Sequence, residues 1–253
     1  MLLVCDIGNS RIKTGIFSKD ELIEFSSFAN TESFSSIFIN HSINQIAISS
    51  VVPKLTDKIL KLFTNYSDSK AFVIDRNVNF SLEIDYDSID TLGVDRICSA
   101  EGALYLYKNS NNYKNYDSNT FIISIDFGTA TTINIILYPG VFIGGTISPG
   151  IKTMFDSLNT KTAQLPSVSE ADYKKIIGRN TFSSIASGVI NSNIGLIDRT
   201  INYLKSEMKA SDIKIFVTGG NAEKLIPHFN FDFTFVKELV LIGIKTVYDK
   251  NIT

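Results

Sequence analysis

Two short turns, one beginning at residue 6 and the other at residue 126, contain residue types that could hold phosphate groups. The first reads DIGNS, from Asp6 to Ser10, and the second reads DFGTA, from Asp126 to Ala130. A glycine lets the backbone approach a phosphate closely, small polar residues supply uncharged donors, and an aspartate at a strand end can hold a hydrated divalent cation. Two such turns facing each other would form a nucleotide clamp.

Each turn lies between two β-prone runs, which predicts a strand, a tight turn and a returning strand. The first hairpin spans Leu2 to Phe17, and the second has strands within Phe121 to Leu137. Helical spacing of apolar residues follows in each half, at Leu55 to Tyr66 and at Thr181 to Met208. The order of elements therefore predicts an α/β protein that contains two copies of the same β-hairpin.

The composition excludes several classes of function. With 253 residues and a formal net charge of −2, the chain has no basic surplus for binding nucleic acid or an anionic membrane. Cys5 and Cys98 show no metal-type spacing and indicate a reducing compartment. No apolar run reaches the roughly 18 residues of a membrane span. We expect a cytoplasmic protein.

Other catalytic chemistries are poorly supported. The only histidines, His41 and His228, stand in segments without partner motifs, so a histidine-based triad or a zinc site is not expected. The chain has no P-loop, and no G-x-G-x-x-G follows a predicted strand. The duplicated turns remain the main candidates for chemistry.

A set of motifs in a fixed order carries a family resemblance. They are D-x-G-N-[ST]-x-x-K at Asp6 to Lys13, G-x-D-R at Gly93 to Arg96, D-F-G-T-A-T-T at Asp126 to Thr132, G-G-x-I-x-P-G at Gly144 to Gly150, G-x-[NS]-T at Gly178 to Thr181 and T-G-G-x-A at Thr218 to Ala222. The chain resembles the type III pantothenate kinases, which belong to the superfamily of acetate and sugar kinases, heat-shock chaperones and actin.

The resemblance implies an α/β fold with two ribonuclease-H-like domains and a nucleotide cleft between them. We expect the domains at residues 1–115 and 116–253. The polar stretch at 108–120, KNSNNYKNYDSNT, is predicted to be a loop or hinge between the halves. A solvated surface loop without a functional role explains this composition equally well.

The resemblance also implies an ATP site with two kinds of cation. It places Mg²⁺ on Asp6 through water and a monovalent cation, K⁺ or NH₄⁺, on Asp126. The residues implied to bind ATP are Asp6, Gly8, Asn9, Ser10, Lys13, Thr129, Gly219 and Gly220. An ordinary hairpin and a tight strand-to-helix turn are the alternative explanations of these glycines.

The second substrate implied by the resemblance is pantothenate. Asp95 corresponds to the base that takes the proton from the pantothenate hydroxyl, and Arg96 to a cation for the anionic substrate or the transferred phosphoryl group. The residues implied to bind pantothenate are Tyr86, Gly93, Val94, Asp95, Arg96 and Thr181. The structural alternatives are helix caps at Asp95 and Thr181 and an exposed loop position for Tyr86.

Two positions depart from the family pattern. Ile89 stands where the family usually has a proline, which affects the loop that carries Tyr86. Asn134 stands where the family often has an aspartate, so one negative charge near the cation site is missing. We expect the second change to weaken cation organisation without abolishing the chemistry.

The resulting hypothesis is ATP-dependent phosphorylation of pantothenate to 4′-phosphopantothenate, the first step of coenzyme A biosynthesis. One alternative is a non-catalytic regulatory relative that keeps the nucleotide fold; another is an actin-like filament subunit, for which no duplicated assembly surface is visible. The family resemblance implies a homodimer. A line of small residues within 184–195 would also allow a second backbone to approach closely.

Overall fold

The structure is a computed structural model that describes residues 1–110 and 117–252. It divides into two compact units. The first comprises Met1–Lys114, Gly140–Ile143 and Glu238–Thr253, and the second comprises Asn115–Pro139 and Gly144–Lys237. The predicted domain boundary between residues 115 and 116 lies outside the described residues. Within the described part of the chain, no helix has the length and hydropathy required to cross a bilayer.

The first unit is built on a five-stranded sheet in the order β3-β2-β1-β4-β5. β1 pairs antiparallel with β2 and parallel with β4. The predicted hairpin is therefore confirmed, and it forms the centre of the sheet. The strands are β1 (Leu2–Ile7), β2 (Ile12–Ser18), β3 (Glu21–Phe28), β4 (Gln45–Ser50) and β5 (Phe72–Val73).

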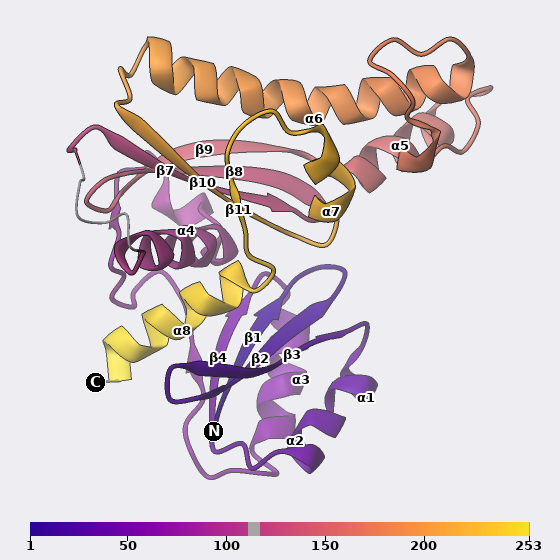
Figure 1. The fold of residues 1–253 in the computed structure, drawn as a ribbon. Coiled ribbons are helices and arrows are strands. Elements are labelled where there is room, and N and C mark those ends of the chain that lie inside the picture. Colours follow the sequence, from indigo (N-terminus) through magenta and orange to yellow (C-terminus); the bar gives the residue numbers. More distant parts are fainter. Residues whose placement is uncertain (111–116, 253) are drawn as a thin grey trace. The chain divides into compact units, whose positions relative to one another are not determined.

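Both faces of the sheet are covered at β1, whose alternate residues point to opposite sides and are almost all buried. Leu3, Cys5 and Ile7 pack with residues of α1 (Thr31–Phe34), α2 (Ser36–Asn40) and α3 (Pro53–Phe63). Leu2 and Val4 pack with residues of α4 (Val94–Lys108) and α8 (Leu239–Ile252) on the other face. Figure 1 shows α1 to α3 on one side of β1, β2 and β4 and α8 on the other.

The second face is covered by a closely packed helix pair. α4 (Val94–Lys108) contacts α8 (Leu239–Ile252), although the two are far apart in sequence. A Cβ atom on Gly102 would overlap the carbonyl oxygen of Leu239, and one on Gly243 would overlap that of Cys98. The glycines thus allow the two backbones to approach, as expected where helices pack without intervening side chains.

A short segment of the first unit precedes α4. β6 (Glu83–Ile84) pairs parallel with Val141 and Phe142, the first residues of β9 (Val141–Pro149). A single 3₁₀ turn, η1 (Ile89–Thr91), then leads to α4. This arrangement brings the predicted loop of Tyr86 next to residues that lie much later in the chain.

The second unit repeats the hairpin in a six-stranded sheet ordered β11-β10-β7-β8-β9-β6, of which β6 and the residues of β9 that pair with it belong to the first unit. β7 (Thr120–Phe127) and β8 (Ala130–Leu137) are antiparallel, and β10 (Asp212–Thr218) and β11 (Thr234–Phe235) extend the sheet by parallel pairing. The α/β fold class predicted from the sequence is confirmed, with a mixed sheet in each unit.

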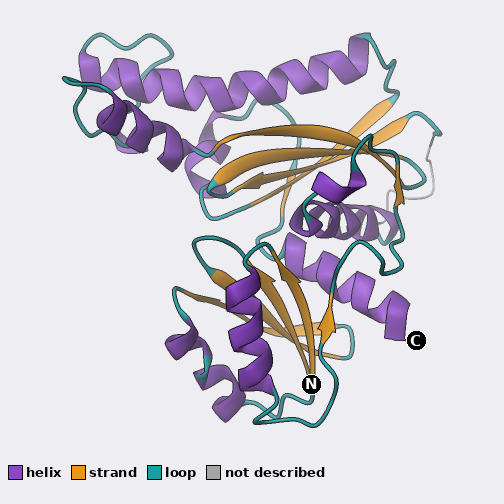
Figure 2. Ribbon diagram, turned by 180° about the vertical axis from the view of Figure 1, so that it is seen from behind, coloured by secondary structure: helices purple, strands orange, loops and turns teal. Residues whose placement is uncertain are grey.

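Helices complete the second unit. α5 (Ile151–Lys161) contacts the long helix α6 (Thr181–Ser206), and the short helix α7 (Ala222–Leu225) follows β10. Figure 2 shows, from behind, α6 running along the sheet of this unit. The predicted helix at Thr181 to Met208 is confirmed, with its C-terminal end two residues earlier.

Candidate active site

The first turn joins β1 to β2 and presents polar residues at the end of the sheet. Ile7 pairs with Ile12, which leaves Gly8 to Arg11 as the turn, and the Gly8 N–H donates to the Arg11 carbonyl at 3.1 Å. Asn9 and Ser10 are exposed. The turn is therefore closed by its own backbone and has polar side chains available outside it.

Asp6 and Lys13 are paired across this hairpin. They occupy opposite positions in the register of β1 and β2, and both are half-buried. Opposite residues of an antiparallel pair project from the same face of a sheet. A carboxylate and an ammonium group thus leave the sheet together beside the turn, a combination that can serve a metal ion and a phosphate.

The start of α4 lies near Asp6 within the first unit. The thiol of Cys98 on α4 is buried close to Ser49, the residue opposite Asp6 on β4. Burial raises the pKa of this thiol well above its usual value, and the nearby charges of Asp6, Glu101 and Asp95 raise it further. The two aspartates predicted to act on phosphate and on the hydroxyl therefore both lie near one buried thiol.

Gly93 and Asp95 form the N-terminus of α4. Gly93 is the N-cap residue and makes no side-chain cap, and Asp95 Oδ1 accepts a hydrogen bond from the Arg96 N–H at 2.9 Å. A Cβ atom on Gly93 would collide with Asp95 Oδ1. Asp95 is thus not the N-cap residue, and the glycine leaves room for its half-buried carboxylate.

Arg96 and Tyr86 face each other in the first unit. The Arg96 guanidinium carbon lies 5.9 Å from the centre of the Tyr86 ring and 5.7 Å from that of Phe142. The Tyr86 and Phe142 rings meet edge to face with centres 6.1 Å apart. Tyr86 is half-buried in this cluster, so the exposed-loop alternative is wrong. Cation–π contacts hold the arginine in place.

The second turn is one residue shorter than the first. Phe127 pairs with Thr131, which leaves Gly128 to Ala130 as the turn, and the Gly128 N–H donates to the Ala130 carbonyl at 3.0 Å. Asp126 is opposite Thr132, the position that Lys13 holds in the first hairpin. The two hairpins therefore differ: the aspartate of the first is opposite a lysine, and the aspartate of the second is opposite a threonine, which has a neutral hydroxyl.

Two further loops of the second unit meet this turn. Gly219 has a φ of +103°, and a Cβ atom there would overlap Phe127 N. The side-chain amide of Asn221 donates to the Gly128 carbonyl at 3.2 Å. Only a glycine allows the T-G-G segment to lie this close to the aspartate turn.

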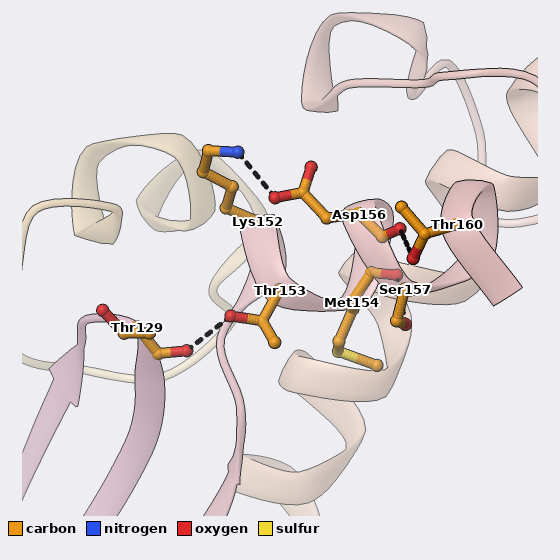
Figure 3. Close-up of polar contacts among 7 residues, drawn as sticks. All are labelled: Thr129, Lys152, Thr153, Met154, Asp156, Ser157 and Thr160. Atoms are coloured by element: carbon orange, nitrogen blue, oxygen red, sulfur yellow. Dashed lines mark hydrogen bonds and ion pairs between the residues drawn. The ribbon is translucent and has the colours of Figure 1, made fainter. Parts of the chain in front are cut away.

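The N-terminus of α5 also contacts the second turn, a contact that the motifs alone did not assign. The Gly150 N–H donates to the Thr129 carbonyl at 2.9 Å. Thr153 Oγ1 donates to the same oxygen at 2.8 Å (Figure 3). Figure 3 also shows the ion pair of Lys152 with Asp156 on the first turns of α5. The sequence motif G-G-x-I-x-P-G, which ends in Gly150, could have indicated that this segment contacts the second turn.

Asn134 lies inside the sheet of the second unit. It is fully buried, and its amide donates to the Ser124 hydroxyl at 3.1 Å. A neutral amide is readily accommodated in such a site, whereas an unpaired carboxylate would be costly to bury. The asparagine that stands in place of the family aspartate is thus stabilised by its hydrogen bond to Ser124.

Thr181 opens α6 and lines a groove. Asn180 is the N-cap residue, and its side chain accepts from the Ser183 N–H at 2.9 Å, so the helix-cap alternative for Thr181 is wrong. Thr181, Gly188 and Val189 line a groove of about 740 Å³, together with residues of α5. Ser184 and Gly188, two of the small residues within 184–195, also line this groove.

Asp6 and Asp126 are carboxylates that could each bind a cation whose remaining ligands are phosphate oxygens and water. Asp6 and Asp126 are both half-buried near the ends of β1 and β7. Within the part of the chain that the structure describes, no three His, Cys, Asp or Glu side chains form a metal-binding group. Mg²⁺ commonly takes one or two carboxylates, with waters and phosphates completing its shell. Asp6, a single half-buried carboxylate of the first unit, fits that pattern.

The structure groups the predicted site residues within each unit. Asp6, Lys13, Asp95, Arg96 and Tyr86 belong to the first unit, with Asp6 and Asp95 near Cys98 and Tyr86 beside Arg96. In the second unit, residues of the Asp126, Thr129 and Gly219 segments are in mutual contact. Thr181 lies on the groove rather than in this contact.

Comparisons with known proteins agree on the family. A family model described as type III pantothenate kinase matches residues 2–203. The chain is 31% identical to a type III pantothenate kinase of Citrifermentans bemidjiense, over 99% of this chain and 100% of the relative.

Solved structures agree on the fold. A crystal structure of a Campylobacter jejuni protein assigned to the Baf family of transcriptional activators matches with a TM-score of 0.63 at 22% identity, over 98% of each chain. The ROK hexokinase of Thermus thermophilus matches with a TM-score of 0.51 at 9% identity, over 97% of each chain. These likenesses show the actin-like ATPase fold.

Proposed function

Because this chain belongs to the type III pantothenate kinase family, we propose that Asp95 and the two hairpin turns carry out the reaction of that family. The reaction transfers a phosphoryl group from ATP to the primary hydroxyl of pantothenate and starts coenzyme A biosynthesis. The observation that supports these roles best is the half-buried Asp95 carboxylate at the start of α4, next to Arg96, which packs against Tyr86.

The two turns bind the nucleotide in this proposal. Gly8, Asn9 and Ser10 contact the phosphates, and Lys13 offsets the charge on the γ-phosphate. On the second unit, Thr129 contacts ATP, and Gly219 and Gly220 let adenosine pass close to the backbone. The hydrogen bonds from Gly150 and Thr153 to the Thr129 carbonyl support the second turn from within its own unit.

Asp95 acts as the general base. Its carboxylate accepts the proton of the pantothenate hydroxyl as that oxygen attacks the γ-phosphorus in line with the leaving ADP. Arg96 binds the anionic part of pantothenate or the transferred group, while Tyr86, Gly93, Val94 and Thr181 shape the pocket. Most of the rate enhancement comes from holding the hydroxyl and the γ-phosphate in the geometry of attack, as is usual for phosphoryl transfer.

Two cations are proposed to assist. When bound, Mg²⁺ would supply positive charge that offsets the charge developing on the phosphates. Asp6 would hold it through water, and Asp126 would hold K⁺ or NH₄⁺. ATP with a divalent cation is general to kinases of this kind, whereas the monovalent cation is the specific part of this proposal.

We further propose a cytoplasmic homodimer. The groove of α5 and α6 is lined by small and apolar side chains, and Ile147 and Phe182 of the same unit are 63% and 48% exposed. A second copy of the chain would cover these side chains, as apolar surface is covered in obligate dimers. Sedimentation of the purified chain at micromolar concentration tests this part.

The kinase activity is tested by ADP release with pantothenate, with K⁺ or Na⁺ present, and by the mass of the product. We expect ADP release that requires pantothenate and a product heavier by one phosphoryl group. Nucleotide binding without pantothenate-dependent ADP release would favour a non-catalytic regulatory relative.

A further inference from the structure

Glu101 is a buried acidic residue to which the reaction as described assigns no part. It lies on α4, the helix that also carries Asp95 and Arg96, and it is 1% exposed. Burial raises the pKa of its carboxyl, although hydrogen bonds and the charge of Lys250 act in the opposite direction. A buried carboxyl group destabilises a fold unless its interactions compensate.

Glu101 makes its hydrogen bonds with one short segment of the chain, at Ser81 and Leu82. Its Oε1 atom accepts hydrogen bonds from the N–H groups of Ser81 at 2.5 Å and Leu82 at 2.9 Å. Its Oε2 atom is buried and has no hydrogen-bond partner among the described residues. The side chain therefore acts as a clamp that joins the middle of α4 to residues 81 and 82.

The clamped segment leads directly to Tyr86. β6 follows Leu82, and the Glu83 N–H donates to the Gly140 carbonyl at 2.9 Å. The Asp85 N–H then donates to the Phe142 carbonyl at 3.0 Å. Tyr86 comes next, with its ring on Phe142.

The segment is thus held to α4 at two points. Glu101 binds its beginning, and Arg96 lies 5.9 Å from the Tyr86 ring at its end. β6 is only two residues long, so its own ladder offers few hydrogen bonds to fix it. Two N–H groups on a single carboxylate oxygen therefore supply much of the hydrogen bonding that fixes the start of the segment.

We propose that Glu101 is a positioning residue for the pantothenate pocket, because it holds the β6 segment on α4 and so keeps Tyr86 against Arg96. This inference rests on the proposed function, in which Tyr86 and Arg96 bind pantothenate. Glu101 touches neither substrate in this account and acts only through Tyr86.

The test compares Glu101→Ala, Glu101→Asp and Glu101→Gln with wild type in steady-state kinetics of ADP release. Glu101→Ala removes both hydrogen bonds and should raise KM for pantothenate by at least about tenfold, with KM for ATP within about twofold of wild type. Glu101→Asp is one methylene shorter and should give an intermediate KM. Glu101→Gln keeps an acceptor oxygen at the same reach and should return KM to within about threefold.

A matched control separates positioning from general destabilisation. Ile59→Ala removes a fully buried side chain from α3, on the opposite face of the sheet. It should lower the melting temperature by as much as Glu101→Ala or more, and leave KM for pantothenate unchanged. A double variant with Tyr86→Ala should show a KM close to that of Tyr86→Ala alone, because the two residues act as one unit.

The outcomes are distinct. If Glu101→Ala and Glu101→Asp keep the wild-type KM for pantothenate, the positioning role is wrong while the kinase function stands. If Glu101→Ala does not fold but Glu101→Asp does, an unchanged KM for pantothenate in Glu101→Asp also shows that the positioning role is wrong. If Ile59→Ala raises the KM as much as Glu101→Ala, the effect is general destabilisation. Wild type without pantothenate-dependent ADP release would instead contradict the proposed function.

Discussion

Gly219 packs directly against Asp126. A Cβ atom on Gly219 would lie 2.5 Å from Asp126 Oδ1, and the φ of +103° at this position disfavours any other residue. Thr218 is also opposite Asp126 in the pairing of β10 with β7. The T-G-G turn and the aspartate of the second hairpin are therefore one structural element of the second unit.

This element leads to a prediction about monovalent cations. If Asp126 holds K⁺ or NH₄⁺, wild-type activity should rise steeply when potassium replaces sodium at constant ionic strength. Asp126→Ala should lose that dependence together with most of the activity, because the cation charge near the phosphates is lost. A flat potassium titration of the wild type would count against the site, with Asn134 as the first residue to suspect.

The turn glycines should serve ligand binding more than folding. A Cβ atom on Gly8 would approach Arg11 O at 3.6 Å, and one on Gly128 would approach nothing nearer than 3.5 Å, both ordinary contacts. Gly8→Ala and Gly128→Ala should each weaken ATP binding or turnover by at least about tenfold, roughly 1.4 kcal/mol. Calorimetric ATP titration and thermal unfolding measure the two effects.

The control for these variants is Gly195→Ala on α6, where a Cβ atom meets nothing within 4 Å. It should leave ATP binding unchanged and raise stability slightly, since alanine favours a helix. Normal ATP binding by both turn variants would rule out the two-turn clamp. Loss of folding in both would show that these glycines serve the hairpins instead.

The packing of α4 on α8 predicts the opposite behaviour for Gly102. Gly102→Ala should lower stability by about 1–3 kcal/mol or more, because the added methyl group would overlap the Leu239 carbonyl. Thermal unfolding measures this effect. An unchanged melting temperature would show that the helices separate easily.

The buried thiols predict a pH effect. Burial raises the pKa of Cys98 in the fold, and that of Cys5 as well. The folded state therefore keeps protons that the unfolded state releases, so the free energy of unfolding should fall as pH rises above about 8.5. A thiol reagent at pH 8 should label neither cysteine in the folded protein and both in denaturant. Rapid labelling of the folded protein would contradict the burial.

Local patterns were enough to predict the two hairpins and α6. In β1 and β7 the apolar run, the Asp-x-Gly turn and the returning run are consecutive, so strand pairing needs no distant residue. The helix start at Asn180 could also have been read from Asn180 and Ser183, which form a capping box. These features depend on neighbours in the sequence.

The long-range contacts were not predictable in this way. The packing of α8 on α4 depends on two glycines, Gly102 and Gly243, that a periodicity argument treats only as weak helix formers. The place of Tyr86 depends on the parallel pairing of β6 with β9, whose residues are distant in sequence. No local pattern states which strand will pair with such a short segment.

Turnover by Asp95→Asn tests most directly whether Asp95 is the base that accepts the hydroxyl proton. Asparagine keeps the oxygen that accepts from the Arg96 N–H, so α4 should start as before, while the base is lost. We expect kcat to fall by roughly 10²–10⁴-fold with ATP affinity little changed. Asp57→Asn, at an exposed site on α3, should match wild type. Near wild-type kcat in Asp95→Asn would contradict the assignment of the base.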